Sequence, residues 1–157
     1  MTFKPDTVDK KLLTALQADA RRSTGELAEL VSMAQSPCWR RIRKLEEAGV
    51  ICGYRATLDR EALGWGVLGF VHLQMQEHTP KIAAAFERDV LSIPQVLACY
   101  NLSGRYDYML EVIETDLKSI SNLVRTRIRA LPGVKEISTT FSLKEIKRTD
   151  ALPVQLL

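Results

Sequence analysis

The chain has 157 residues, a formal net charge of +3 and 26% charged residues, which fits a globular protein of one domain or two small ones. Its apolar runs are far too short to cross a bilayer and its charged N-terminal stretch is unlike a signal peptide, so we expect a cytoplasmic protein without a membrane partner. The excess positive charge is concentrated: residues 1–60 hold 11 Lys or Arg and 8 Asp or Glu, whereas residues 61–157 hold 11 of each.

Three short helices are predicted in the first 50 residues. In the first, apolar residues recur at helical spacing, at Val8, Leu12, Leu13 and Leu16. The second begins at the sequence STGE, residues 23–26, in which Ser23 and Glu26 form a capping box. Its apolar side is expected to carry Leu27, Leu30 and Val31. The small and polar residues 32–35 then predict a tight turn before the third helix.

The third helix is predicted to begin with Ser36 as N-cap and Pro37 at the first helical position, and to end at Gly49. At about 100° per residue, its core stripe consists of Cys38, Ile42 and Leu45. Its opposite side carries Ser36, Arg40, Arg43 and Lys44. Two helices joined by a tight turn, the second of them basic, match the helix-turn-helix plan, in which the second helix enters the major groove of DNA.

The outer side of this third helix supplies the candidate DNA contacts. Arginines bind guanine edges or phosphates, and a helix N-terminus holds phosphate. A basic helix side is most often merely solvated, so the helix-turn-helix context, not the charge, favours DNA. Trp39 fits a core residue, a residue packed on the DNA backbone or a base contact equally well. The candidate DNA-binding residues are Gln35, Ser36, Pro37, Trp39, Arg40, Arg43 and Lys44.

From Val50 onward the pattern changes to short strands and helices. Residues 50–58, VICGYRATL, predict a short strand and linker, and a turn-rich connection follows. After it come predicted strands at 67–75, 96–102, 106–113 and 134–146, with helices starting at Thr79-Pro80 and at about Asp116. The resulting order β-α-β-β-α-β is the ferredoxin-like pattern, an antiparallel sheet with both helices on one face. The first three strands are apolar on both faces, so a self-complementary homodimer is expected to cover the other face.

Apolar spacing also predicts which residues face the core of this second part. The first helix is expected to bury Ile82, Phe86 and Val90, and the second to bury Leu117, Ile120, Val124, Ile128 and Leu131. The last strand is expected to alternate, with Ile137, Thr139, Phe141 and Leu143 on one side. The fold class is therefore α+β. The predicted division is a helix-turn-helix domain at 1–52, a hinge strand and linker at 53–66, a ferredoxin-like domain at 67–148 and a C-terminal tail at 149–157.

Read in this order, the chain resembles the Lrp/AsnC (feast/famine) family of transcription regulators over nearly its whole length. The opening helices, the basic helix with its hinge, the turn at 102–107 and the final helix-strand unit carry the resemblance. Their sequences are VDKKLLTALQADARRSTGELAELV, SPCWRRIRKLEEAGVICGYRATLD, LSGRYDYMLEV and LPGVKEISTTFSLKEIK. The order and spacing of the four pieces are more specific than any one of them.

The resemblance implies a winged helix-turn-helix domain and a ferredoxin-like domain that dimerises through its sheet, with dimers assembling into octamers or similar closed particles. It also implies that an amino acid or related metabolite binds between subunits, without any other cofactor. The effector site would include Leu102, Ser103, Gly104, Arg105, Tyr106 and Asp107, with Ser138, Thr139 and Thr140 from a neighbouring subunit. Ser103 and Gly104 would allow close approach of a carboxylate to the backbone, and Asp107 would bind the amino group.

The sequence departs from the family pattern at two places. Where relatives commonly have an acid, this chain has Arg105, which is free to pair with an effector carboxylate or with Asp107. Family members often begin the basic helix with Ser-Pro two residues earlier, where this chain has Ala34-Gln35. The later Ser36-Pro37 cap would then leave Gln35 in the turn.

Three other functions were weighed against an effector-responsive regulator. An architectural DNA-binding protein would bind independently of metabolites. Some tetrapyrrole decarboxylases share the two-domain plan, but the region ACYNLSGRYDYML lacks their histidine, and no nucleophile-base pair or P-loop is present. RNA binding is disfavoured because the aromatic strands of RNA-recognition sheets are absent. Cys38, Cys52 and Cys99 have no metal-ligand spacing, and His72 and His78 do not cluster with them, so we expect no metal and no enzyme.

Overall fold

A computed structural model describes residues 3–157, which form two compact units, each with a core of its own. The first unit holds the residues up to Thr57 together with Lys147–Leu157, and the second holds Leu58–Ile146. This division differs from the predicted one at the C-terminus, because the final residues belong to the first unit. No helix in the part of the chain described is long and apolar enough to cross a membrane.

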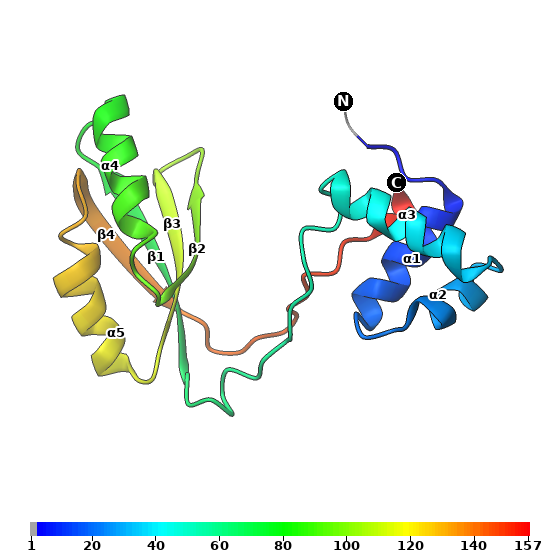
Figure 1. The fold of residues 1–157 in the computed structure, drawn as a ribbon. Helices are drawn as coiled ribbons and strands as arrows, with labels where there is room; N and C mark the ends of the chain where they lie inside the picture. Colours follow the sequence, from blue (N-terminus) through cyan, green and yellow to red (C-terminus); the bar gives the residue numbers. More distant parts are fainter. Residues whose placement is uncertain (1–2) are drawn as a thin grey trace. The chain divides into compact units, whose positions relative to one another are not determined.

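The first unit contains the three predicted helices, α1 (Thr7–Ala18), α2 (Thr24–Leu30) and α3 (Gln35–Glu47) (Figure 1). The capping box at the start of α2 is confirmed: the Glu26 amide donates to the Ser23 hydroxyl, and the Ser23 amide donates to the Glu26 carboxylate. The core of the unit joins all three helices through Leu12, Leu27, Cys38 and Ile42. Leu30, by contrast, is 44% exposed, so its predicted place in the core was wrong.

Helix α3 begins earlier than predicted. Its N-cap is Ala34, whose side chain makes no capping hydrogen bond, and its first bond runs from the Cys38 amide to the Ala34 carbonyl at 3.2 Å. Ser36 is therefore not the N-cap, and Gln35 lies in the helix instead of the turn. Pro37 fits the third helical position as well as the first, because the first-turn N–H groups have no partner within a helix.

The end of α3 is confirmed at Gly49, which has a φ of +69°. Its amide donates to the Glu46 carbonyl at 2.9 Å, and the Val50 amide donates to the Leu45 carbonyl at 2.9 Å. This pair of bonds is a Schellman motif, which requires the left-handed backbone that glycine adopts without steric penalty. The motif directs the chain out of the helix at a defined residue.

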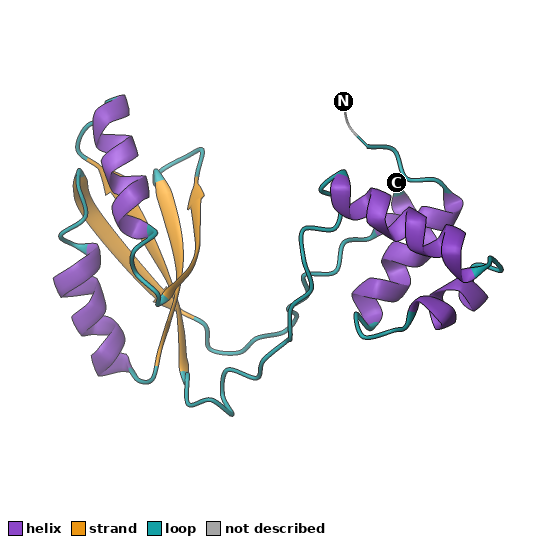
Figure 2. Cartoon of the chain, in the orientation of Figure 1, coloured by secondary structure: helices purple, strands orange, loops and turns teal. Residues whose placement is uncertain are grey.

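Residues 50–66 form a loop with one turn and contain no strand (Figure 2). The predicted hinge strand in this segment was wrong. Its β-branched and aromatic residues are scattered, and a strand needs a partner to bond its backbone groups. Within the second unit, Leu58, Leu63 and Trp65 line a pocket of about 370 Å³ together with Ile113 of the sheet.

The second unit is a four-stranded antiparallel sheet with the order β2-β3-β1-β4 and two helices on one face (Figure 1). Its strands are β1 (Val67–Met75), β2 (Val96–Asn101), β3 (Tyr108–Glu114) and β4 (Val134–Phe141). Its helices are α4 (Pro80–Val90) and α5 (Leu117–Leu123). This order confirms the ferredoxin-like topology: β1 and β3 are the central strands, α4 connects β1 to β2, and α5 connects β3 to β4.

The core of this unit lies between the sheet and the helices, where Phe86 and Ile120 are fully buried against Val71 and Leu110. Two predicted core positions were wrong: Leu117 is 60% exposed and Leu143 is fully exposed. β4 ends at Phe141, which pairs with Gly69 of β1, and only Val67 and Leu68 of β1 precede that pair, so most of the alternating sequence beyond Phe141 has no β1 residue to pair with. After α5 the helix continues as a π-helical turn, Val124–Ile128.

The last residues fold back onto α1 within the first unit. Val154 is buried against Leu13 and Leu45. The side chain of Gln17 exchanges two hydrogen bonds with the backbone of Leu152, at 2.6 and 3.0 Å. The tail is thus part of the packing of the helical unit, which neither its polarity nor its position in the sequence indicated.

Candidate nucleic-acid interface and effector site

The two faces of α3 separate as predicted. Cys38 and Leu45 are fully buried and Ile42 is 9% exposed, and burial raises the pKa of the Cys38 thiol. On the opposite side the exposed residues include Gln35, Ser36, Arg40, Arg43 and Lys44. Pro37 is half-buried. The helix therefore presents a cationic surface whose position is fixed by the core beneath it.

Trp39 and Arg43 form a small cluster on this exposed surface. Trp39 is 53% exposed, so it is not a core residue, and the Arg43 guanidinium lies 5.7 Å from the centre of its ring. Arg43 also lies 3.7 Å from the Glu46 carboxylate and 3.8 Å from that of Glu47. Exposed pairs at these distances contribute little to stability, so they exchange readily for a phosphate or a base. Arg40 has no ion pair with any residue from 3 to 157, which leaves its guanidinium available.

Arg41 has a different role from its neighbours. Its Nη1 donates to carboxylate oxygens of both Asp6 and Asp9, each at 2.7 Å. The two acids form the capping box of α1, since each carboxylate accepts the backbone amide of the other. Asp9 is 8% exposed, which makes it a buried charge that needs a partner. Arg41 therefore links α3 to the start of α1 and is expected to be structural.

We expect Arg41→Met to lower the free energy of unfolding by about 1.5–3 kcal/mol, because the buried Asp9 carboxylate loses its charged partner. Hydrogen bonds from the Asp9 amide and from Arg41 lower the pKa of Asp6, so the stability this carboxylate contributes is present at neutral pH. This contribution is lost as pH falls below about 4. The difference in stability between Arg41→Met and the unchanged protein should therefore shrink at low pH. Urea unfolding at pH 7 and pH 3.5 measures both effects.

Arg43→Met is the matched control, since it removes the same charge from the same helix but only exposed ion pairs. Its cost should stay below about 1 kcal/mol. Equal losses in the two variants would show that the Arg41 network does not stabilise the fold.

The predicted effector turn is a tight and braced loop between β2 and β3. The Leu102 amide donates to the Asp107 carbonyl at 2.8 Å, and the Asp107 amide donates to the Leu73 carbonyl at 2.9 Å. The Asp107 carboxylate accepts the Met75 amide at 2.7 Å. At the tip, Gly104 has a φ of +126°, in the region that favours glycine, and Ser103 is exposed beside it. Asp107 therefore already fixes the turn, with its second oxygen left for another partner.

Charges of both signs surround this turn. Arg105 lies 3.9 Å from the Glu136 carboxylate at the start of β4 and 5.1 Å from the centre of the Tyr106 ring. The His78 imidazole lies 3.8 Å from the second Asp107 oxygen. Within the described residues the ion-pair partner of Arg105 is Glu136 and not Asp107. The sequence missed Glu136 and His78, because neither lies near the turn along the chain.

The three predicted effector residues on β4 lie on different faces of the sheet. Ser138 pairs with His72 and Thr140 with Phe70 in the ladder, so these two hydroxyls share the face away from the helices. Thr139 pairs with Val71, whose side chain is in the core, and therefore faces the helices. The His72 ring lies 5.2 Å from that of Tyr106, which connects the Ser138 side of β4 to the turn. Of the three predicted effector residues on β4, Ser138 and Thr140 therefore lie on the same face of the sheet as His72, and Thr139 does not.

A helix-turn-helix unit with a cationic outer helix, followed in one chain by a ferredoxin-like unit with a charged polar turn, defines a two-domain class of DNA-binding regulators. The comparisons agree along the whole chain. Residues 5–51 match the winged helix-turn-helix DNA-binding family, and residues 68–152 match the Lrp/AsnC ligand binding domain.

The curated relatives cover nearly the full chain. A DNA-binding transcriptional activator, DecR of Escherichia coli, is 34% identical over 96% of this chain and 99% of its own length. The Bkd operon transcriptional regulator of Pseudomonas aeruginosa is 36% identical over 95% of this chain and 97% of its own. The chain therefore belongs to the Lrp/AsnC family and is a DNA-binding transcription regulator of that type.

Solved structures give the same assignment. A transcriptional regulator of Neisseria meningitidis in complex with L-Met superposes with a TM-score of 0.92 at 35% identity, over 98% of this chain and 100% of that one. An AsnC family regulator of Agrobacterium tumefaciens gives 0.91 at 32% identity, over 97% and 99% of the two chains. These matches confirm the predicted α+β fold and family.

Proposed function

We propose that α3 is the recognition helix and that its exposed cations carry DNA binding. The observation that supports this most is the separation of its faces: a buried Cys38 and Leu45 fix the helix, while Arg40 and Lys44 point away from the core. Arg40 is the first candidate for a base contact because it has no competing partner in the part of the chain described. Arg43, with Trp39 beside it, is the second. Gln35, Ser36 and Pro37, in the first turn, suit contacts with the DNA backbone.

We further propose that the turn at 102–107 binds an amino acid. A free amino acid carries a carboxylate and an ammonium group. The turn holds a cation that can pair with the first and an acid that can pair with the second. Arg105 suits the carboxylate, and the Asp107 oxygen that does not accept the Met75 amide, 3.8 Å from His78, suits the ammonium group. Arg105 and Glu136 pair only weakly in the free protein, at 3.9 Å, so a ligand replaces that contact at little cost. The regulator of N. meningitidis bound to L-Met supports this ligand class.

The assembly that places such a site between subunits is proposed to be a homodimer, with dimers joining into a closed particle such as an octamer. Leu58, Leu63 and Leu97 are 70%, 60% and 48% exposed around one pocket of the second unit. Contiguous apolar surface of this kind favours burial against a second copy. An effector bound between subunits would act by favouring one arrangement of the helices α3 over another.

Two measurements on the full-length protein test this function. DNA selected from a random library should converge on a sequence with two half-sites about one or two helical turns apart. In a thermal-shift screen of the amino acids, at least one should raise the melting temperature and also change the affinity for the selected DNA. A ligand at 100 times its Kd adds about 2.7 kcal/mol to the stability of the native state.

The two results together separate the alternatives. A converged DNA site without any effect of an amino acid would leave a regulator that does not respond to this ligand class. Failure of the selection to converge would instead indicate an architectural protein that binds DNA without sequence preference.

A further inference from the structure

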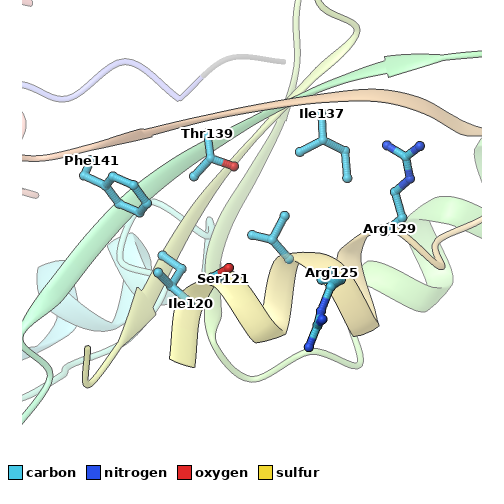
Figure 3. A pocket seen from close by; sticks show the side chains of 8 residues that line it. Ile120, Ser121, Arg125, Arg129, Ile137, Thr139 and Phe141 are labelled. Atoms are coloured by element: carbon cyan, nitrogen blue, oxygen red, sulfur yellow. The ribbon is translucent and has the colours of Figure 1, made fainter. Parts of the chain in front are cut away.

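A pocket of about 390 Å³ lies on the helix-covered side of the second unit, between α5 and the edge strand β4 (Figure 3). Ile120 and Ser121 face it from the helix, and Ile137, Thr139 and Phe141 face it from the strand. The volume falls within the range of small-molecule sites, about 300–1,000 Å³. Four of the eight lining residues are apolar, two carry a hydroxyl group and two are arginines, and an apolar wall with a few polar groups is typical of a site for a small organic ligand.

The pocket is separate from the effector turn. None of the residues 102–107 lines it, and of the predicted effector residues only Thr139 does. Ser138 and Thr140, the residues on either side, point to the opposite face of the sheet. A ligand in this pocket would therefore be bound in addition to an amino acid at the turn, and the inference does not depend on the function proposed above.

The charged residues that line the pocket are both cations, Arg125 and Arg129. Residues 117–131 contain one lysine and three arginines and no acid. Arg125 donates to the Asn122 side chain at 3.5 Å and extends away from β4 in Figure 3, whereas the Arg129 guanidinium rises toward the strand beside Ile137. Arg129 has no ion pair with any of residues 3–157, so the apolar pocket has an uncompensated cation at its rim.

The backbone of the helix is irregular at the same place. The Arg129 amide donates to the Val124 carbonyl at 2.9 Å, a bond across five residues that makes Val124–Ile128 a π turn. Such turns are rare and occur frequently at functional sites. Cations near the C-terminus of a helix interact favourably with the helix dipole. This interaction accounts for the arginines, but it does not account for the irregular turn or for the pocket that the turn lines.

We propose that this pocket binds a small carboxylic acid with an apolar chain, as a second ligand site of the protein. The apolar chain lies between Ile120 and Phe141, and the carboxylate pairs with the Arg129 guanidinium and accepts a hydrogen bond from a lining hydroxyl. An uncharged ligand of the same shape would leave the guanidinium without a partner. A ligand with an added ammonium group would bring a positive charge into a pocket whose lining residues include no acid.

Isothermal titration of the full-length protein with 4-methylpentanoate and with the isosteric 4-methylpentanamide tests the proposal. The acid should bind at least about tenfold more tightly than the amide, a difference of about 1.4 kcal/mol. Ser121→Phe should abolish binding of the acid, because the new ring fills the pocket. Arg129→Gln should weaken it about tenfold or more, by the loss of a charge-assisted contact.

Arg127→Gln is the matched control: it removes the same charge from the same turn, but Arg127 is exposed and does not line the pocket. Its affinity for the acid should stay within about twofold of the unchanged protein. The melting temperature of each variant shows whether it folds, and the comparison of acid with amide needs no variant. Equal binding of acid and amide would overturn the proposal. So would loss of binding in Asp107→Ala with retention in Ser121→Phe, which would place the acid at the effector turn.

Discussion

Replacing Arg40 and Arg43 together with alanine should weaken binding to the selected DNA site by about 100-fold or more, because each arginine that reads a base contributes about 1–3 kcal/mol. The protein should remain folded, since both side chains are exposed and neither touches the core. Fluorescence anisotropy with labelled DNA at several salt concentrations measures the loss. Binding as tight as that of the unchanged protein would rule out α3 as the recognition helix.

The single variants separate the two ways in which an arginine binds DNA. A residue that reads a base should relax the preference at one position of the site, whereas a phosphate contact should weaken all sequences alike and lower the salt slope by about 1. We expect base reading for Arg40, which is unpaired within the part of the chain described. Arg43 must first leave Glu46 and Glu47.

Lys118→Ala combined with Arg127→Ala is the control for net charge. The pair removes the same two charges from exposed positions of the second unit, to which α3 does not belong. General attraction to DNA would weaken equally in the two double variants, whereas a specific contact surface on α3 would be lost only in the first. Circular dichroism spectra of both should match that of the unchanged protein.

The helical part of the fold could be predicted because its causes are local. The spacing of Cys38, Ile42 and Leu45 determines which side of α3 is buried, and the Ser23–Glu26 capping box determines where α2 begins. The start of α3 was missed by two residues, since the N-cap is Ala34 and the first helical residue is Gln35. Pro37 is compatible with any position in the first turn, so it marks a helix start without fixing the residue.

Features that depend on distant parts of the chain could not be read from the sequence. The alternating pattern continues past β4 to Leu143, but the ladder with β1 ends at the pair Gly69–Phe141, close to the start of β1 at Val67. Burial of Val154 against Leu13 joins residues more than a hundred positions apart. The apolar spacing predicts a regular α-helix through Val124–Ile128, whereas the structure has a π turn there.

The effector turn contains one feature that could be predicted from nearby residues and one that depends on distant residues. The turn at 102–107 could be predicted, and Gly104 within it has a φ of +126°, which favours glycine. The pairing of Arg105 with Glu136 could not, because β4 reaches the turn only through the pairing of the whole sheet. The position of the charges relative to one another is what gives the turn its complementarity to an amino acid.

Asp107→Asn and Asp107→Ala should both abolish the response to an amino acid, with a loss of affinity of about 10- to 100-fold, because neither side chain offers a charge to the ammonium group. The two differ in what they do to the turn. In the unchanged protein the Asp107 carboxylate accepts the Met75 amide at 2.7 Å. Asparagine keeps an oxygen that can accept this amide, whereas alanine leaves the amide without this partner. Thermal shift and calorimetry with the amino acid found in the screen measure the loss.

The comparison between the two variants decides the role of this residue. If Asp107 recognises the ammonium group, Asp107→Asn should lose the response while its stability without ligand and its affinity for DNA stay close to those of the unchanged protein. Asp107→Ala should then be less stable by about 1–3 kcal/mol, the cost of an unsatisfied amide at a partly buried site. A full response in Asp107→Asn would mean that this carboxylate braces the turn and does not bind the effector, and that the ammonium group is held elsewhere, with Glu136 the next acid to replace.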